Sequence, residues 1–170
     1  MFDDPFLPAT PRQDASAGDG DAFREAEIAV QAVRDVALLK AQALAKRYSE
    51  RRTMLQETDG GEFIGIFLDV RARSEGRSIS LEWKLGHYRN GQFVGSTNIS
   101  KPRGSAGYDI ARLKRRSPEW AHALVIETEM EARQIREALL RLTEADTALR
   151  VARRRLTNEP DGPLADHASD

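Results

Sequence analysis

Apolar side chains follow a helical spacing over the first third of the chain. Between Asp21 and Glu57 there is no Gly or Pro, and apolar residues recur at intervals of three, four or seven. These positions are Phe23, Ala26, Val30, Val33, Ala37, Leu44 and Tyr48. The spacing places them on one face and predicts one long amphipathic helix. Asp21 is expected to cap its start, and Gly60 or Gly61 is expected to end it in the left-handed conformation.

Between residues 62 and 100 the hydrophobic period changes to two, which is typical of β-strands. The alternating positions are Ile64, Ile66, Leu68 and Val70 in a first segment and Ile79, Leu81, Trp83 and Leu85 in a second. Asn90 and Gly91 then form the dipeptide most typical of a tight hairpin turn. After this turn Phe93, Thr97 and Ile99 alternate. The sequence therefore predicts three antiparallel strands.

A second long helix is predicted from Ser117 and Pro118, which resemble an N-cap and a first-turn proline, to about Thr157. Its apolar stripe consists of Trp120, Leu124, Ile135, Leu142, Leu149 and Leu156, and it is interrupted by Thr128 and Glu131. Each helix would be roughly 60 Å long and would extend beyond the small sheet. Because an apolar stripe must be covered, we expect the two helices to form a hairpin or the chain to form a homodimer.

The two ends of the chain differ from this patterned middle. They are rich in Asp, Gly, Pro and Ser and have few apolar residues, so ordering them would not be offset by burial. The predicted fold class is α+β, with a long N-terminal helix, a three-stranded antiparallel sheet and a long C-terminal helix. Residues 1–19 and 158–170 are predicted to be disordered acidic tails, and residues 20–157 a single α-βββ-α domain.

Composition excludes several classes of site. The chain of 170 residues contains no cysteine, which excludes disulfides, thiolate nucleophiles and cysteine-ligated metal centres. It begins without the features of a signal peptide, and no apolar run approaches the roughly 20 residues that span a bilayer. We therefore expect a cytoplasmic protein that does not contact a membrane.

The net charge of −1 conceals a cationic block in the middle of the chain. Residues 71–116 contain eleven basic and three acidic residues. Glycines let a backbone approach a phosphate closely, and Lys or Arg neutralises the phosphate charge. We expect double-stranded DNA to contact Lys84, Arg89, Lys101, Arg103, Gly104, Tyr108, Arg112, Lys114, Arg115 and Arg116. Because some of these charges lie on strands, a folded sheet is expected to gather them on one surface. The alternative is a solvated cationic loop without a ligand, or one neutralised by the acidic tails.

One pattern resembles an enzyme site. Asp69 followed by Glu82 and Lys84 matches the loose carboxylate arrangement of Mg²⁺-dependent nucleases. A turn near residues 75 and 76 would bring Asp69 opposite Glu82, but a simple cross-strand ion pair on a wet sheet face is the commoner result of such a pattern. Neither the histidines nor the glycines form a metal, catalytic or nucleotide-binding set, so no cofactor is expected.

Three stretches resemble the MobI family of conjugative transfer proteins, carried by integrative conjugative elements and large plasmids. They are "ISLEWKLGHYRNGQF", "NISKPRGSAGYDIARL" and "SPEWAHALVIETEMEARQIREAL", and the resemblance covers roughly residues 62–140. It implies a non-enzymatic mobilisation factor that recognises the origin of transfer and helps a relaxase or other transfer proteins assemble there. By position it involves Trp83, Lys101, Arg103, Gly104, Tyr108, Trp120 and Glu127, of which Trp83 and Trp120 are expected to be packing residues.

Three functions remain open from the sequence. The chain is a DNA-binding accessory protein of transfer, or it is a non-catalytic coiled-coil adaptor whose charge maintains solubility. The metal nuclease built on Asp69, Glu82 and Lys84 is a third alternative.

Overall fold

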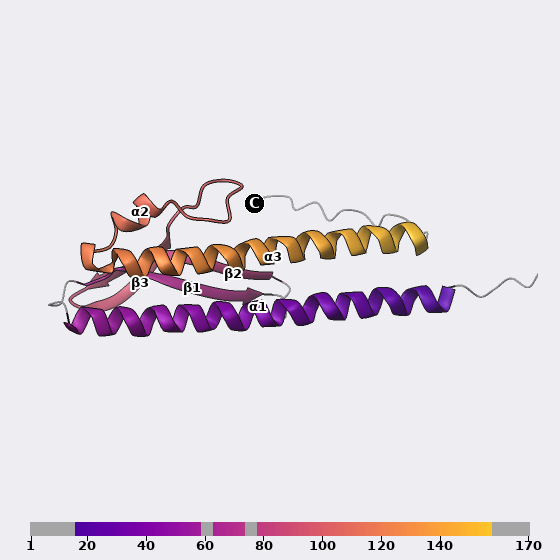
Figure 1. The fold of residues 1–170 in the computed structure, drawn as a ribbon, viewed down its shortest axis with the longest axis horizontal. Coiled ribbons are helices and arrows are strands. Elements are labelled where there is room, and N and C mark those ends of the chain that lie inside the picture. The colour runs from indigo at the N-terminus through magenta and orange to yellow at the C-terminus, as the bar shows by residue number, and fades with distance from the viewer. Residues whose placement is uncertain (1–15, 59–62, 74–77, 158–170) are drawn as a thin grey trace, which may run out of the picture.

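The computed structural model describes residues 16–58, 63–73 and 78–157 (Figure 1). The elements are helix α1 (Ser16–Thr58), strands β1 (Ile66–Arg73), β2 (Ser78–Arg89) and β3 (Gln92–Asn98), the short helix α2 (Ile110–Lys114), a 3-10 turn η1 (Glu119–Ala121) and helix α3 (His122–Thr157). The predicted α+β order of helix, three strands and helix is confirmed. The turns expected at Gly60 or Gly61 and at residues 75 and 76 lie outside the described residues, as do residues 1–15 and 158–170.

Helix α1 begins earlier than predicted. Its first residue is Ser16, so Asp21 lies inside the helix and the prediction of an Asp21 cap is wrong. Residues 16–19, assigned to the tail from the sequence, extend the helix instead. Adding residues to an existing helix is far easier than nucleating one, so a long helix can include poor helix formers such as Gly18 and Gly20.

The two long helices lie side by side and run in opposite directions, and both extend beyond the sheet (Figure 1). Their pairing is marked by four ion pairs, in which a residue further along α1 always meets one earlier in α3. These pairs are Glu27–Arg153, Arg34–Asp146, Arg47–Glu131 and Arg51–Glu127. Of the two arrangements expected for the overhanging helices, the hairpin is therefore present within one chain.

The helix interface differs in detail from the predicted stripes. Val33 is 53% exposed and Leu156 is also exposed, whereas Arg34 and Thr128 are buried. Arg34 reaches across to α3, where its guanidinium donates to the Leu142 carbonyl and pairs with Asp146 at 3.5 Å. A long side chain that finds partners for its charge can occupy a buried position, and helical spacing alone does not reveal this.

The sheet is an antiparallel meander with the order β1-β2-β3. Asp69 faces Glu82 across β1 and β2, as predicted. Asn90 and Gly91 adopt positive φ angles of 51° and 76°, as the hairpin required. The alternation expected through Phe93 is wrong, because a bulge opposite His87 and Tyr88 shifts the register and pairs Phe93 with Tyr88. Phe93 therefore joins an aromatic cluster with Phe67 and Tyr88 and is not on the face of buried Ile99.

One core joins the helix pair to the sheet. Trp83 is fully buried, as expected of a packing residue, and its ring meets the edge of Tyr48 from α1 with centroids 5.0 Å apart. The Tyr48 hydroxyl donates to the Ile66 carbonyl, which ties α1 to β1. Burial raises the pKa of Tyr48, so it stays a neutral hydrogen-bond donor.

The segment between β3 and α3 is more ordered than a flexible loop. It contains α2, which was not predicted, and α3 starts at His122 rather than at Ser117. Ser117 does not cap α3, because its hydroxyl donates to the Leu113 carbonyl at the end of α2. No described helix is both long and apolar enough to traverse a bilayer.

Candidate nucleic-acid interface

The basic segment, residues 100–116, follows β3 and lies beside α3 on the side away from α1 (Figure 1). It starts from a fixed point, since the Ile99 amide donates to the Trp83 carbonyl at 2.9 Å. Pro102 to Ser105 then form a tight turn closed by a 3.1 Å backbone bond. Gly104 has a φ of 75° at the third position, where such a turn favours glycine. This geometry places Arg103 at the tip of the turn.

Glu129 of α3 anchors the end of this turn from inside the core. Only 2% of the residue is exposed, and its two carboxylate oxygens accept hydrogen bonds from the Tyr108 amide and from Nε1 of Trp83, both at 2.7 Å. Arg136, two helical turns further along the same face of α3, donates to the same carboxylate at 2.5 Å. The carboxylate is thus satisfied by three donors, as a buried charge must be.

Arg136 completes this anchor. Besides Glu129, its guanidinium donates to the Ala106 carbonyl of the basic segment and, at 3.3 Å, to the Leu81 carbonyl of β2. It also lies 5.0 Å from the centroid of the Tyr108 ring, within cation–π range. A single buried ion pair therefore connects α3, the sheet and the basic segment.

Tyr108 belongs to this buried network and not to the surface. Burial raises its pKa, and its hydroxyl oxygen accepts a hydrogen bond from the Trp83 amide. Its expected role as a DNA contact is not supported by this position, because the ring is covered by Arg136 and the hydroxyl is occupied. Its contribution to the basic segment is to fix the backbone.

Helix α2 is short but fixed at both ends. Asp109 caps its N-terminus by accepting from the Ala111 amide at 2.9 Å, and Leu113 is fully buried against the core. At its other end, Nε2 of His122 bonds the Lys114 carbonyl at 3.1 Å. Arg112 reaches back to the Ser100 carbonyl at 3.4 Å, which brings the two ends of the basic segment together.

The cations of this segment have no carboxylate partners among the described residues. Those concerned are Lys101, Arg103, Arg112, Lys114, Arg115 and Arg116. Only one acidic residue, Asp109, lies between them, and its side chain is used by the helix cap. The structure therefore brings six of the ten predicted DNA contacts into one uncompensated cationic segment, together with Gly104.

Lys84 is not part of this surface, so its position does not support its expected role as a DNA contact. It is 4% exposed and its ammonium pairs with Asp69 at 2.8 Å. Arg71 pairs with the same carboxylate at 2.7 Å, so the sheet neutralises part of the cationic block instead of displaying it. Partial burial acts to raise the pKa of Asp69, but the hydrogen bonds and charges of Lys84 and Arg71 outweigh it and lower the pKa.

Arg89 is also separate from the basic segment. It lies at the end of β2 beside the hairpin turn, whereas the segment packs near the start of the strand. Seven residues separate Arg89 from Glu82, which is about 23 Å along a strand. Arg89 is therefore an exposed cation that lies apart from the basic segment.

The geometry of the nuclease alternative is not assembled. The Asp69 carboxylate is occupied by Lys84 and Arg71, as in the simple ion pair that competed with this interpretation. The described sheet has only antiparallel neighbours and no crossover helix between its strands. The described residues also contain no group of three or more His, Cys, Asp or Glu placed to hold a metal ion.

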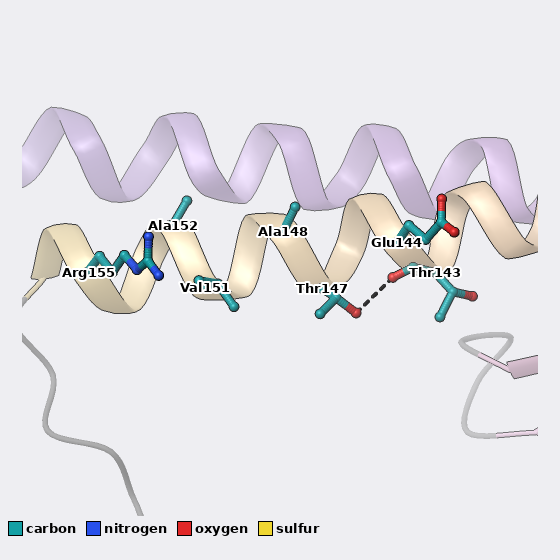
Figure 2. Close-up of a pocket in the computed structure, with 7 residues that line it drawn as sticks. All are labelled: Thr143, Glu144, Thr147, Ala148, Val151, Ala152 and Arg155. Atoms are coloured by element: carbon teal, nitrogen blue, oxygen red, sulfur yellow. Dashed lines mark hydrogen bonds between the residues drawn. The ribbon is translucent and has the colours of Figure 1, made fainter.

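Two hollows lie along α3. One, of about 520 Å³, opens between the basic segment, the start of β2 and α3. The other, of about 560 Å³, follows the distal part of α3, and Figure 2 shows that all seven residues lining it belong to that helix. Only the first collects side chains from several elements.

Glu129 and Arg136, the residues that position the basic segment, were not predicted from the sequence. A signal was present, because the two lie seven residues apart on the same helical face as Val125 and Ala132, both of which are fully buried. A carboxylate and a guanidinium on one apolar face predict a buried ion pair.

A family model described as MobI protein matches residues 23–150 of the chain. The match includes most of α1, which the resemblance seen in the sequence did not cover, together with the sheet, the basic segment and most of α3. No curated protein and no solved structure matches the chain.

Proposed function

The chain belongs to the MobI family, and we propose that it is a non-catalytic mobilisation factor that binds double-stranded DNA at the origin of transfer. Family membership makes it a mobilisation-related protein. The proposal adds that the basic segment contacts DNA phosphates and that the protein assists assembly of a relaxase or other transfer proteins there.

The observation that carries the proposal is the group of cations in the basic segment that have no carboxylate partner within the described part of the chain. Like charges held close together repel one another, so a fixed cluster of them lowers stability unless a polyanion compensates it. DNA supplies one negative charge per ~1.7 Å of duplex and releases counterions when Lys or Arg replaces them. The buried anchor around Glu129 and Arg136 supports the proposal further, because it holds the backbone of the segment in place before binding.

Sequence reading would depend on the same surface. Arg103 stands at the tip of a turn and Arg112 near its base, and arginine is well suited to the acceptor edge of guanine in the major groove. Phosphate contacts from Lys101, Lys114 and Arg116 would set the orientation and most of the affinity.

The helix pair offers the surface for a protein partner. It exposes large apolar side chains, among them Ile28, Val36 and Leu39 of α1. Such residues favour contact with a relaxase, another transfer protein or a second copy of the chain. The same observation favours the adaptor as the second candidate function, in which the basic segment would have no role.

The test is the electrophoretic mobility of origin-of-transfer DNA with the full chain at NaCl concentrations from about 50 to about 300 mM. We expect a shift whose affinity falls steeply with salt. The variant Lys101→Gln, Arg103→Gln, Arg115→Gln, Arg116→Gln should flatten this dependence by about four units of the logarithmic slope.

The matched control changes four paired cations of the helices, in the variant Arg47→Gln, Arg51→Gln, Arg141→Gln, Arg150→Gln. It has the same net charge but should retain most of the affinity. Equal loss of affinity in both variants would show that net charge alone matters, and the absence of a shift at low salt would refute DNA binding. Normal transfer in cells with the basic-segment variant would favour the adaptor.

A further inference from the structure

The hollow beside the basic segment has two chemically different sides. Its apolar side is formed by Ile79 at the start of β2, Pro102 of the turn, and Leu139 and Leu140 of α3. Its mouth carries Lys101 and Arg103 from the turn. A site with an apolar slot and adjacent cations suits a flat, weakly polar ring that carries a negative group.

The hollow is formed by fixed backbone. Leu81 and Ala106 both line it, and the carbonyls of both accept hydrogen bonds from the guanidinium of Arg136. The Ser105 hydroxyl bonds both the amide and the carbonyl of Gly107, which holds the far side of the turn. Because these contacts are all made within the protein, binding would not have to order the loop.

From this geometry we propose that the hollow binds one unstacked nucleotide of DNA, with its base against Pro102, Leu139 and Leu140 and its phosphate on Lys101 and Arg103. This inference rests on the proposed function and specifies it. Proteins that extrude a base hold it between apolar side chains and read its Watson–Crick edge by hydrogen bonds. The volume of about 520 Å³ lies within the range of small-ligand pockets and accommodates a single nucleotide.

Glu82 supplies a group that would read the base. It lines the hollow and is half-buried, yet it forms no hydrogen bond or ion pair with any other residue in the described part of the chain, since the neighbouring Lys84 is bound to Asp69. A carboxylate accepts hydrogen bonds and donates none. Guanine presents adjacent N1–H and N2–H donors on its Watson–Crick edge, so Glu82 should favour guanine over thymine.

The hollow of Figure 2 is a poorer candidate of similar size. Its residues come from one helix, and Thr143, Glu144 and Thr147 are engaged within that helix, as is seen where Thr147 donates to the Thr143 carbonyl. It has no cation pair and no second wall among the described residues. The two hollows therefore provide a site and an internal control on the same helix.

The experiment compares a fully paired duplex with the same duplex carrying one unpaired guanine or one unpaired thymine, by fluorescence anisotropy with the full chain. We expect the guanine bulge to bind about ten-fold tighter than the paired duplex. The thymine bulge should bind with intermediate affinity. Glu82→Gln should reduce the difference between the two bulges.

Leu140→Trp tests the site itself. Leu140 is 51% exposed, so a larger side chain there fills the hollow without disturbing the core. It should abolish the preference for a bulge and leave binding of the paired duplex unchanged. The control Leu156→Trp, at an exposed position on the same helix, should keep the preference.

Each outcome separates this inference from the function on which it rests. Tight binding of paired and bulged duplex alike, or a bulge preference that survives Leu140→Trp, would overturn the inference and leave DNA binding intact. Failure to bind any DNA would overturn both. The last measurement is a titration with dGMP. If dGMP bound as tightly as the guanine bulge, the hollow would be a site for a free nucleotide, and the inference that it binds a nucleotide of DNA would be overturned.

Discussion

The helix pair and the basic segment use the same side chains in opposite ways. On α1 and α3, arginines meet carboxylates, either across the pair, as Arg47 meets Glu131, or along one helix, as Arg133 meets Glu137. In the basic segment, arginines and lysines follow one another with Asp109 as the single acidic residue, and it is used to cap α2. Paired charges arrange the protein internally, whereas unpaired charges are available to a partner.

This difference is not visible in the net charge of −1. The carboxylates that balance the total are concentrated elsewhere along the chain, so the average describes neither region. The function of a cation therefore depends on whether the fold places a carboxylate within about 4 Å of it.

The largest effect is expected from Glu129→Ala. The substitution leaves the buried Arg136 without a compensating charge and frees the Tyr108 amide and Trp83 Nε1. We expect the free energy of unfolding to fall by about 3–5 kcal/mol, measured by urea denaturation. Glu131→Ala, two residues away on the same helix but exposed, should cost far less. Equal costs would show that the basic segment is not anchored through the core.

Asp69→Asn is expected to cost about 1–2 kcal/mol at pH 7, because buried Lys84 loses its carboxylate while Asp69 itself keeps some contact with solvent. The pKa of Asp69 is lowered in the folded state, so its contribution is fully present above the usual pKa of about 3.9 and disappears as the pH falls through the lower folded value. The stabilities of wild type and variant should therefore converge as the pH falls below about 4. A difference in stability that stays constant as the pH falls would contradict the pairing.

Arg116→Gln removes a single positive charge from the basic segment. It should weaken DNA binding roughly five-fold to ten-fold at moderate salt and lower the salt slope by about one. The free energy of unfolding should change by no more than about 0.5 kcal/mol, since the side chain is exposed. Arg47→Gln removes the same charge from the helix pair and should leave the slope unchanged. An identical change in slope for both would remove the distinction between the regions.

The smallest effect is expected from the surface ion pair itself. A double-mutant cycle of Arg47→Gln and Glu131→Gln should give a coupling free energy of about 0.2–1 kcal/mol, because both side chains are about half exposed. Denaturant titration of the four proteins measures this coupling free energy. A coupling of several kcal/mol would mean that such bridges, and not apolar packing, hold the helices together.

Much of the fold was predictable because its signals are local. Asn90 and Gly91 specify a tight hairpin turn, and the alternation ending at Trp83 and Leu85 specifies a strand with one buried face. The register that sets Asp69 opposite Glu82 followed from the length of the connection. The bulge that moved Phe93 could not be predicted in this way, since the shift depends on how β3 fits the twisted edge of β2.

The candidate site was predictable only in part. The run of cations from Lys101 to Arg116 is a property of the sequence, and the fold left it unpaired among the described residues. In the sequence Lys84 resembled the other cations predicted to contact DNA, but Asp69, its diagonal neighbour on β1, neutralises its charge. Tyr108 looked exposed beside two glycines, but contacts with Glu129 and Arg136 from a helix more than twenty residues away buried it.

By itself the sequence determined the elements and the charge density of the segment between them, because helical and strand periods and turn dipeptides act over a few residues. Only the tertiary structure decided which charges are compensated, because ion pairing depends on distances between side chains from different elements. It also created the hollow beside Lys101 and Arg103, whose walls come from a strand, a turn and a helix that no local pattern brings together.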